Sequence, residues 1–184
     1  MFVDRKSDDA RTNDTDVDIE LHLAKDTSYT YSSDLDSFNF QNEVHDYVGF
    51  PIISLNIRSL VNKNNFAKFE GFLETLSVKP LVIALNETWM SKNNNLGPHQ
   101  SLKGYQFVHN SRKHAVGGGV AFFVSNEIHF KTIESLSIMK EKIFESLFLE
   151  VDTGGRKIIC GSVYRSPNYN HEDFNQIWPK SYQK

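Results

Sequence analysis

Three polar side chains stand at the ends of apolar, strand-like segments of the sequence. Asn56 follows the run FPIISL, Glu87 follows LVIALN, and Tyr164 closes KIICGSV. In open α/β sheets the carboxyl ends of strands border the ligand crevice, so we expect an amide, a carboxylate and a phenol to converge there. A glutamate oxygen suits Mg²⁺, which keeps several waters and needs only one or two carboxylates. This trio predicts metal-assisted hydrolysis of a phosphodiester.

Arginines near the same segments add candidate phosphate contacts. Arg58, Arg112 and Arg165 are the candidates, because a guanidinium group matches the geometry of phosphate oxygens. Asn56 would orient the metal ligand or a phosphate oxygen, and Tyr164 would hydrogen-bond a phosphate. Each residue type also has a structural explanation, as a turn asparagine, a solvated strand-end glutamate, a tyrosine packed at a sheet rim or a surface arginine. The residue types alone leave both explanations open.

The segments that carry Asn56 and Glu87 have the pattern of a βαβ unit. Residues 50–55 and 81–85 are nearly continuous apolar runs, which is typical of strands buried on both faces of a parallel sheet. Between them, NNFAKFEGFLETL has apolar residues at helical spacing. The predicted core face of this helix consists of Phe66, Phe69, Leu73 and Leu76, with Phe72 widening it.

The rest of the chain adds strands and a second helix. We expect one strand at YQFVHN (105–110) and another at GGGVAFFVS (117–125), which is entered through Gly117–Gly119. ESLFLEV (145–151) alternates in period two and should pair with 157–164 through a GGR turn. A helix is expected from His171, ended by Pro179. Six strands and two helices predict an α/β layered domain.

Charge divides the chain into two parts. Residues 1–46 hold 4 Lys+Arg and 12 Asp+Glu, a net charge of -8, whereas residues 47–184 hold 16 and 11, a net of +5. The acidic part has few apolar residues and no sustained period, so we expect a disordered N-terminal segment over 1–46. Residues 47–184 are expected to fold as one domain. Their mildly basic charge is compatible with a polyanionic partner.

The composition also predicts a compartment. Cys160 is the one cysteine, so an internal disulfide is excluded, as fits a reducing environment. No apolar run approaches the roughly 18 residues of a membrane helix, and no leader-like segment begins the chain. We therefore expect an intracellular protein, nuclear or cytoplasmic, with no membrane partner. The sequence does not predict an oligomeric state.

Four motifs together resemble a known family. SLNIRSL, ALNETW, GGGVAFFV and VYRSP, in this order, resemble the endonuclease/exonuclease/phosphatase superfamily, above all the apurinic-like endonuclease domain of non-LTR (LINE-type) retrotransposons. The resemblance covers roughly residues 48–178. It implies a four-layer α/β sandwich of the DNase I type and a magnesium-dependent DNA endonuclease within a polyprotein that also carries a reverse transcriptase. By position, Asn56, Glu87 and Tyr164 would be its active-site asparagine, metal-binding glutamate and phosphate-contacting tyrosine.

Two departures from the family pattern shape the expected function. Arg58 stands where repair-type relatives carry an acid, which disfavours a repair enzyme and, with ETW, a phosphatase or RNA-processing role. The family's later Gly-Asp-Phe-Asn and Ser-Asp-His segments do not occur before Lys184, and EDFNQ (172–176) follows YRSP too closely to be the first of them. We therefore interpret the chain as the N-terminal portion of such a domain, incomplete at the C-terminus and weakly active or inactive by itself. The alternative is a non-catalytic remnant that binds nucleic acid or another partner.

Overall fold

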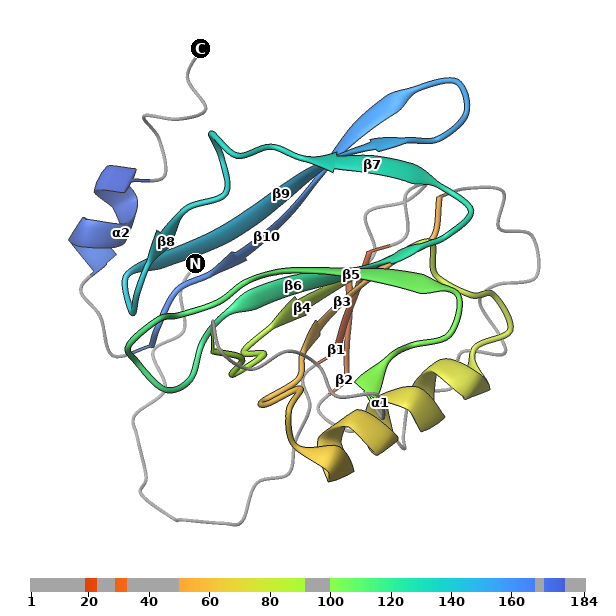
Figure 1. Ribbon diagram of the computed structural model, residues 1–184, viewed down its shortest axis with the longest axis horizontal. Coiled ribbons are helices and arrows are strands. Elements are labelled where there is room, and N and C mark those ends of the chain that lie inside the picture. The colour runs from red at the N-terminus through yellow and green to blue at the C-terminus, as the bar shows by residue number, and fades with distance from the viewer. Residues whose placement is uncertain (1–18, 23–28, 33–49, 92–99, 168–170, 178–184) are drawn as a thin grey trace.

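The computed structural model describes residues 19–22, 29–32, 50–91, 100–167 and 171–177. These residues form two sheets and two helices (Figure 1). The elements in chain order are β1 (Ile19–His22), β2 (Tyr29–Ser32), β3 (Ile52–Asn56), α1 (Lys63–Thr75), β4 (Val82–Asn86), β5 (Tyr105–Asn110), β6 (Val120–Ser125), β7 (His129–Thr132), β8 (Met139–Lys140), β9 (Phe144–Asp152), β10 (Lys157–Tyr164) and α2 (His171–Ile177).

The predicted βαβ unit is confirmed. β3 and β4 pair in parallel, with Asn56 opposite Asn86, and α1 connects them. β4 continues into β6 and β5 by antiparallel pairing, so the first sheet has the order β2-β1-β3-β4-β6-β5. Because β3 and β4 are parallel and in register, both end at the same edge of the sheet. The parallel pairing of β3 and β4 therefore places Asn56 and Glu87 next to each other at this edge.

The continuous apolar runs reflect burial on both faces of the first sheet. In β4, Ile83 and Leu85 pack towards α1, whereas Val82 and Ala84 pack towards the second sheet. β6 divides in the same way, since Phe123 belongs to the first core and Phe122 to the second. A strand covered on both sides has no polar face, and this explains why the sequence shows no alternation there.

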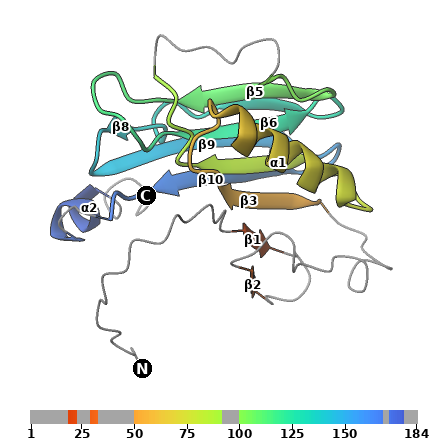
Figure 2. The same cartoon turned by 90° about the horizontal axis from the view of Figure 1, so that it is seen from below.

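Helix α1 covers one face of this sheet (Figure 2). Its N-cap is Asn62, whose side chain accepts hydrogen bonds from the backbone N–H groups of Asn64 and Asn65. All five apolar residues predicted for its core face are buried, which confirms the helical spacing; they are Phe66, Phe69, Phe72, Leu73 and Leu76. The helix ends at Thr75, so Leu76 is the C-cap residue and still packs into the core.

The second sheet is built on the expected hairpin. β9 and β10 pair antiparallel, and Thr153 N–H donates to Arg156 O across the turn, in which Gly154 has a φ of 81°. The inward residues of β9 contact the first sheet as the alternation predicts; they are Leu147, Leu149 and Val151. β7 and β8 also pair with β9, although neither was expected. Both are short and half exposed, so they carry little apolar signal.

The layers are helix, sheet and sheet, as Figure 1 shows. The mixed α/β class is thus confirmed, with more strands than the six expected. Helix α2 lies beside β8 and contacts the second sheet through Phe174, whose ring centroid is 5.2 Å from that of Phe144. The short α2 does not cover that sheet, so the described residues show three full layers.

Eight residues of the segment expected to be disordered are strands instead. β1 pairs antiparallel with β3, and β2 pairs with β1, which extends the first sheet beyond β3 (Figure 2). Strand pairing uses backbone groups, and an open edge such as that of β3 can be paired without an apolar sequence. The other residues of 1–46 lie outside the described residues, as does Pro179.

Candidate active site

Glu87 is where the three strand-end residues meet. Its Oε1 accepts hydrogen bonds from Asn56 Nδ2 at 3.2 Å and from the Tyr164 hydroxyl at 3.1 Å. Asn56 ends β3, Glu87 follows β4 and Tyr164 ends β10, so the contact joins both sheets. The structure thus brings together the amide, the carboxylate and the phenol that the sequence placed at strand ends. No described residue hydrogen-bonds Oε2 of Glu87, which leaves that oxygen available to a ligand.

A part-buried hydrogen bond between the sheets helps to fix this meeting point. Ser162 Oγ donates to Asn86 Oδ1 at 2.9 Å, and Ser162 is two residues before Tyr164 in β10. Asn86 immediately precedes Glu87. The hydrogen bond therefore sets the register of β10 against β4 at the point where their site residues follow. Ser162 is itself buried, so breaking this hydrogen bond would leave a buried hydroxyl without this partner, which favours the observed geometry.

Backbone strain is concentrated around the same residues. Of the non-glycine residues with positive φ in the described part of the chain, four lie in two site segments: Arg58 (42°), Ser59 (89°), Glu87 (53°) and Trp89 (53°). Backbone hydrogen bonds hold the two segments together, with Ser59 N–H donating to Glu87 O at 2.8 Å. Such conformations cost of order 1–3 kcal/mol each and cluster at functional sites. The strain supports a functional reading of these two segments.

The strand-end residues border a cleft of about 530 Å³. Arg58 lies exposed on its wall. Among the described residues that line the cleft, Glu87 is the one carboxylate, and none is a histidine, aspartate or cysteine. The lining residues are Asn56, Arg58, Glu87, Trp89, Arg112, Val116, Gly117, Gly118, Tyr164, Ser166 and Pro167.

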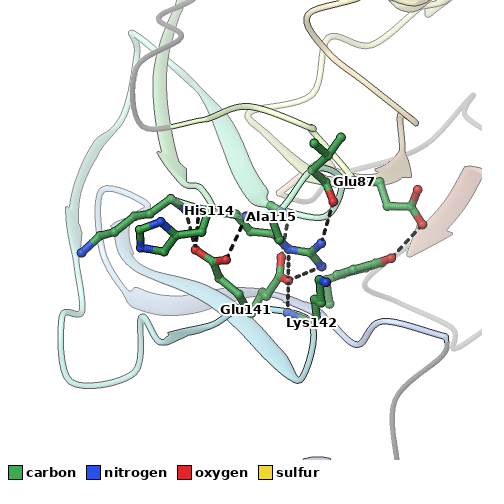
Figure 3. Close-up of polar contacts among 11 residues, drawn as sticks. Glu87, His114, Ala115, Glu141 and Lys142 are labelled. Carbon is green, nitrogen blue, oxygen red and sulfur yellow. Dashed lines mark hydrogen bonds and ion pairs between the residues drawn. The ribbon is translucent and has the colours of Figure 1, made fainter.

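Arg112 lines the cleft, but its charge is largely committed to a buried partner. Only 4% of the residue is exposed, and its Nε donates to Glu145 Oε1 at 2.5 Å. Its Nη1 donates to Val116 O at 3.1 Å, whereas Nη2 lies against Glu145 as an ion pair without a hydrogen bond of its own. Figure 3 shows this network beside Glu87. The sequence predicted a phosphate contact here, with a surface arginine as the alternative, and the structure shows a buried guanidinium in the wall of the cleft.

Arg165 is not brought into the cleft. It follows Tyr164 directly, yet it is absent from the lining residues. Its Nη1 is buried and has no hydrogen-bond partner within the part of the chain that the structure describes. The cleft therefore contains five of the six predicted site residues.

The environment of Tyr164 raises its pKa to about 12. Burial is the largest cause, and the negative charge of Glu87 and the hydrogen bond to it add to the effect. The phenol therefore keeps its proton at neutral pH and acts as a hydrogen-bond donor. It can orient Glu87 or a phosphate oxygen, but it cannot serve as a general base there.

Two glutamates of the site region were not foreseen. Glu145 is wholly buried and also accepts the N–H groups of Gly119 at 2.5 Å and Lys142 at 3.1 Å. The alternation in ESLFLEV places it on the same face as Leu147, and an acid on an apolar face is a signal that could have found it. Glu141 accepts three N–H groups from the loop that follows Arg112; their donors are Lys113, His114 and Ala115 (Figure 3). These hydrogen bonds lower the pKa of Glu141.

Comparisons with known proteins leave the family open. A scan against protein-family models found no match, and a search of curated proteins found none either. The described residues include no group of three or more His, Cys, Asp or Glu side chains placed to hold a metal. Within the same residues, no helix is long and apolar enough to cross a membrane. The function must therefore be argued from the cleft and the motifs.

Proposed function

We propose that the cleft holds a magnesium ion and a DNA phosphate, and that it belongs to a magnesium-dependent endonuclease of the retrotransposon type. The observation that carries this proposal is the convergence of Asn56, Glu87 and Tyr164 from three strand ends at one carboxylate oxygen. The resemblance of the four motifs to the endonuclease/exonuclease/phosphatase superfamily supports it. A four-layer sandwich of the DNase I type belongs to the same proposal.

The residues present fit a magnesium ion that takes few ligands from the protein. Magnesium is held by one or two carboxylates plus waters and substrate phosphates. Glu87 offers a carboxylate with one oxygen oriented by two hydrogen bonds and the other without a described partner. When bound, the metal would polarise a phosphate oxygen and stabilise the leaving oxygen. Asn56 and Tyr164 would hold Glu87 in place, and Arg58 would contact the phosphate from the exposed wall.

Magnesium binding tests the assignment of Glu87. Isothermal titration should detect binding to the wild type and none to Glu87→Ala, with Glu134→Gln as a control, because Glu134 is exposed and lies outside the cleft. Urea unfolding should show that both variants are folded under the conditions of the titration. Equal magnesium binding by wild type and Glu87→Ala would overturn the proposal.

Plasmid nicking tests the chemistry. A general base contributes roughly 10²–10⁴-fold to such reactions, and the described cleft residues include no imidazole or second carboxylate to act as one. We therefore expect this chain to nick supercoiled DNA slowly in magnesium, and any nicking should vanish in Glu87→Ala. Nicking of equal rate in the Glu87→Ala variant would contradict the proposed role.

A second candidate function is DNA binding without hydrolysis. The single carboxylate and the absence of a base among the described lining residues favour it. It predicts that the chain binds magnesium and DNA measurably but yields no nicked product even after prolonged incubation. Binding and nicking measured on the same samples therefore separate the two functions.

A further inference from the structure

Apolar side chains are exposed where the cleft would meet its substrate. Four large hydrophobic residues are exposed in the described part of the chain, and two of them, Trp89 and Val116, line the cleft. Trp89 is 41% exposed and Val116 is 89% exposed. The rest of the cleft lining includes Glu87 and two arginines, so these apolar groups adjoin charged ones. Exposed apolar groups that gather at one polar cleft point to a ligand with an apolar part.

The backbone holds Trp89 rigidly while its ring stays exposed. Its neighbours Thr88 and Met90 are both buried, and its own N–H donates to Gly118 O at 2.9 Å. Its φ of 53° is rare for a bulky residue and costs free energy. The surrounding structure therefore fixes the backbone from which the exposed indole projects. Little backbone entropy is lost at this residue when a ligand stacks on the ring.

The indole lies close to the site proposed for the phosphate. Trp89 Nε1 and Arg112 Nη1 lie 3.8 and 3.7 Å from the point that a Cβ would occupy at Gly117. Both groups therefore lie beside Gly117, where a Cβ would be in ordinary van der Waals contact with each of them. Glu87, which would hold the metal, is two residues before the indole. The exposed indole thus lines the same cleft as Glu87 and Arg58, the residues proposed to hold the metal and the phosphate.

We infer that Trp89 is a stacking platform for a nucleobase, and that the cleft selects a nucleotide whose base is unpaired. A nucleotide carries its base and its phosphate on one sugar, so it matches a site with a ring beside cationic and metal-binding groups. A base inside an intact duplex is stacked on both faces and cannot lie on an indole without being unstacked. Single-stranded, frayed or distorted DNA supplies such a base at lower cost. This inference rests on the proposed function, since it assumes that the cleft holds a phosphate.

Fluorescence provides the test, because the chain has two tryptophans, Trp89 and Trp178. In a Trp178→Phe background, all tryptophan fluorescence comes from Trp89. The probes, titrated in magnesium, are a short oligothymidylate, an abasic oligomer of equal length and a duplex of equal length; electrophoresis checks that each stays intact. We expect the oligothymidylate to quench Trp89 and to bind about 10-fold more tightly than the abasic oligomer, the magnitude typical of one stacked base.

Variants at Trp89 should remove that preference selectively. Trp89→Leu should bind the abasic oligomer as the Trp178→Phe protein does and lose the 10-fold advantage of the base, whereas Trp89→Phe should keep part of it. Val78→Ala is the matched control, because Val78 is also 41% exposed but lies outside the cleft. Binding of Trp89→Leu and the control is measured by anisotropy of labelled oligomers, and their urea midpoints verify folding.

The outcomes separate this inference from the proposed function. Equal affinity of the Trp178→Phe protein for the oligothymidylate and the abasic oligomer would overturn the platform, as would a preference that survives in Trp89→Leu. Tighter binding of the duplex than of the single strand would also overturn it. A base preference that persists in Glu87→Ala supports the platform, even where the magnesium assignment fails.

Discussion

At Glu87, one oxygen carries both described hydrogen bonds and the other carries none. Asn56 and Tyr164 donate to the same Oε1, so they orient the carboxylate without occupying it. Asn56 also accepts the N–H of Arg58 at 3.3 Å, as a turn asparagine does. The turn explanation and the functional explanation of Asn56 are therefore compatible, because one side chain shapes the turn with its oxygen and holds Glu87 with its nitrogen.

The pKa of Tyr164 gives a prediction about pH. Because it is raised to about 12, the folded state holds this proton more tightly than the unfolded chain, whose tyrosines titrate near pH 10. The stabilisation is fully present below about pH 10 and is lost as the pH rises through about 12. The difference in tyrosinate ultraviolet absorbance between wild type and Tyr164→Phe should show this late titration. In Glu87→Gln the pKa should fall, since the negative charge is gone while the burial remains; an unchanged value would contradict the contact.

The buried Arg112–Glu145 pair leads to a prediction about stability. Removing one partner strands the other charge in the protein interior, so Glu145→Leu should destabilise the fold by about 3–5 kcal/mol. Arg112→Met with Glu145→Leu should be less destabilising than Glu145→Leu alone, because no buried charge is then left unpaired. Urea unfolding of the wild type, the single variants and the double variant measures this coupling. Additive effects of the two single substitutions would show that the pair is not energetically linked.

At the scale of the elements, the segment Gly117–Gly119 before β6 leaves room for the buried side chain of Arg112. A Cβ on Gly118 would overlap the guanidinium of Arg112, and Gly118 has a φ of 63°. Gly118→Ala should therefore displace Arg112 from Glu145 and destabilise the protein by at least about 1–3 kcal/mol. Gly155→Ala is the matched control, because a Cβ there meets nothing within 4 Å. Equal urea midpoints for the two variants would refute this account of the glycine.

The strand-end positions of the site could be predicted because they follow from local pattern. The apolar runs and the helical spacing of Phe66, Phe69 and Leu73 fix a βαβ unit, and its parallel strands bring Asn56 and Glu87 to one edge. The state of Arg112 could not be predicted in the same way. Its burial depends on Glu145, which is distant in sequence and pairs only once the two sheets pack.

Strands β1, β7 and β8 were not predicted, because their own amino-acid sequences do not show a strand pattern. β7 and β8 exist as strands because β9 offers them an edge, and their half-exposed sequences carry no clear alternation. β1 similarly depends on the open edge of β3. Pairing of backbone groups, unlike burial of apolar ones, leaves little trace in amino-acid type.

Across the whole molecule, charge is distributed unevenly along the chain, with a net charge of -8 over residues 1–46 and +5 over 47–184. The register Ser32–Ile19–Leu55 runs across β2, β1 and β3, so the chain leaves β2 about 10 Å from the residue before Asn56. The segment that follows, 33–46, carries four acidic residues and no lysine or arginine, and it lies outside the described part of the chain. At about 0.1 M salt the Debye length is about 10 Å, so a negative charge close to the end of β2 would act on a polyanion bound in the cleft as proposed.

Under the proposed function, neutralising that segment should strengthen DNA binding. The variant Asp34→Asn, Asp36→Asn, Glu43→Gln, Asp46→Asn removes four negative charges and takes the formal net charge from -3 to +1. Fluorescence anisotropy with a labelled oligonucleotide should show several-fold tighter binding at low salt, and the gain should disappear near 1 M salt, where charges are screened within about 3 Å. The control variant Ser33→Ala, Ser37→Ala, Asn39→Ala, Asn42→Ala keeps the charge at -3 and should bind as the wild type does. A gain that persists at high salt, or one shared by the control, would show that side-chain contacts of the segment and not its charge affect DNA binding.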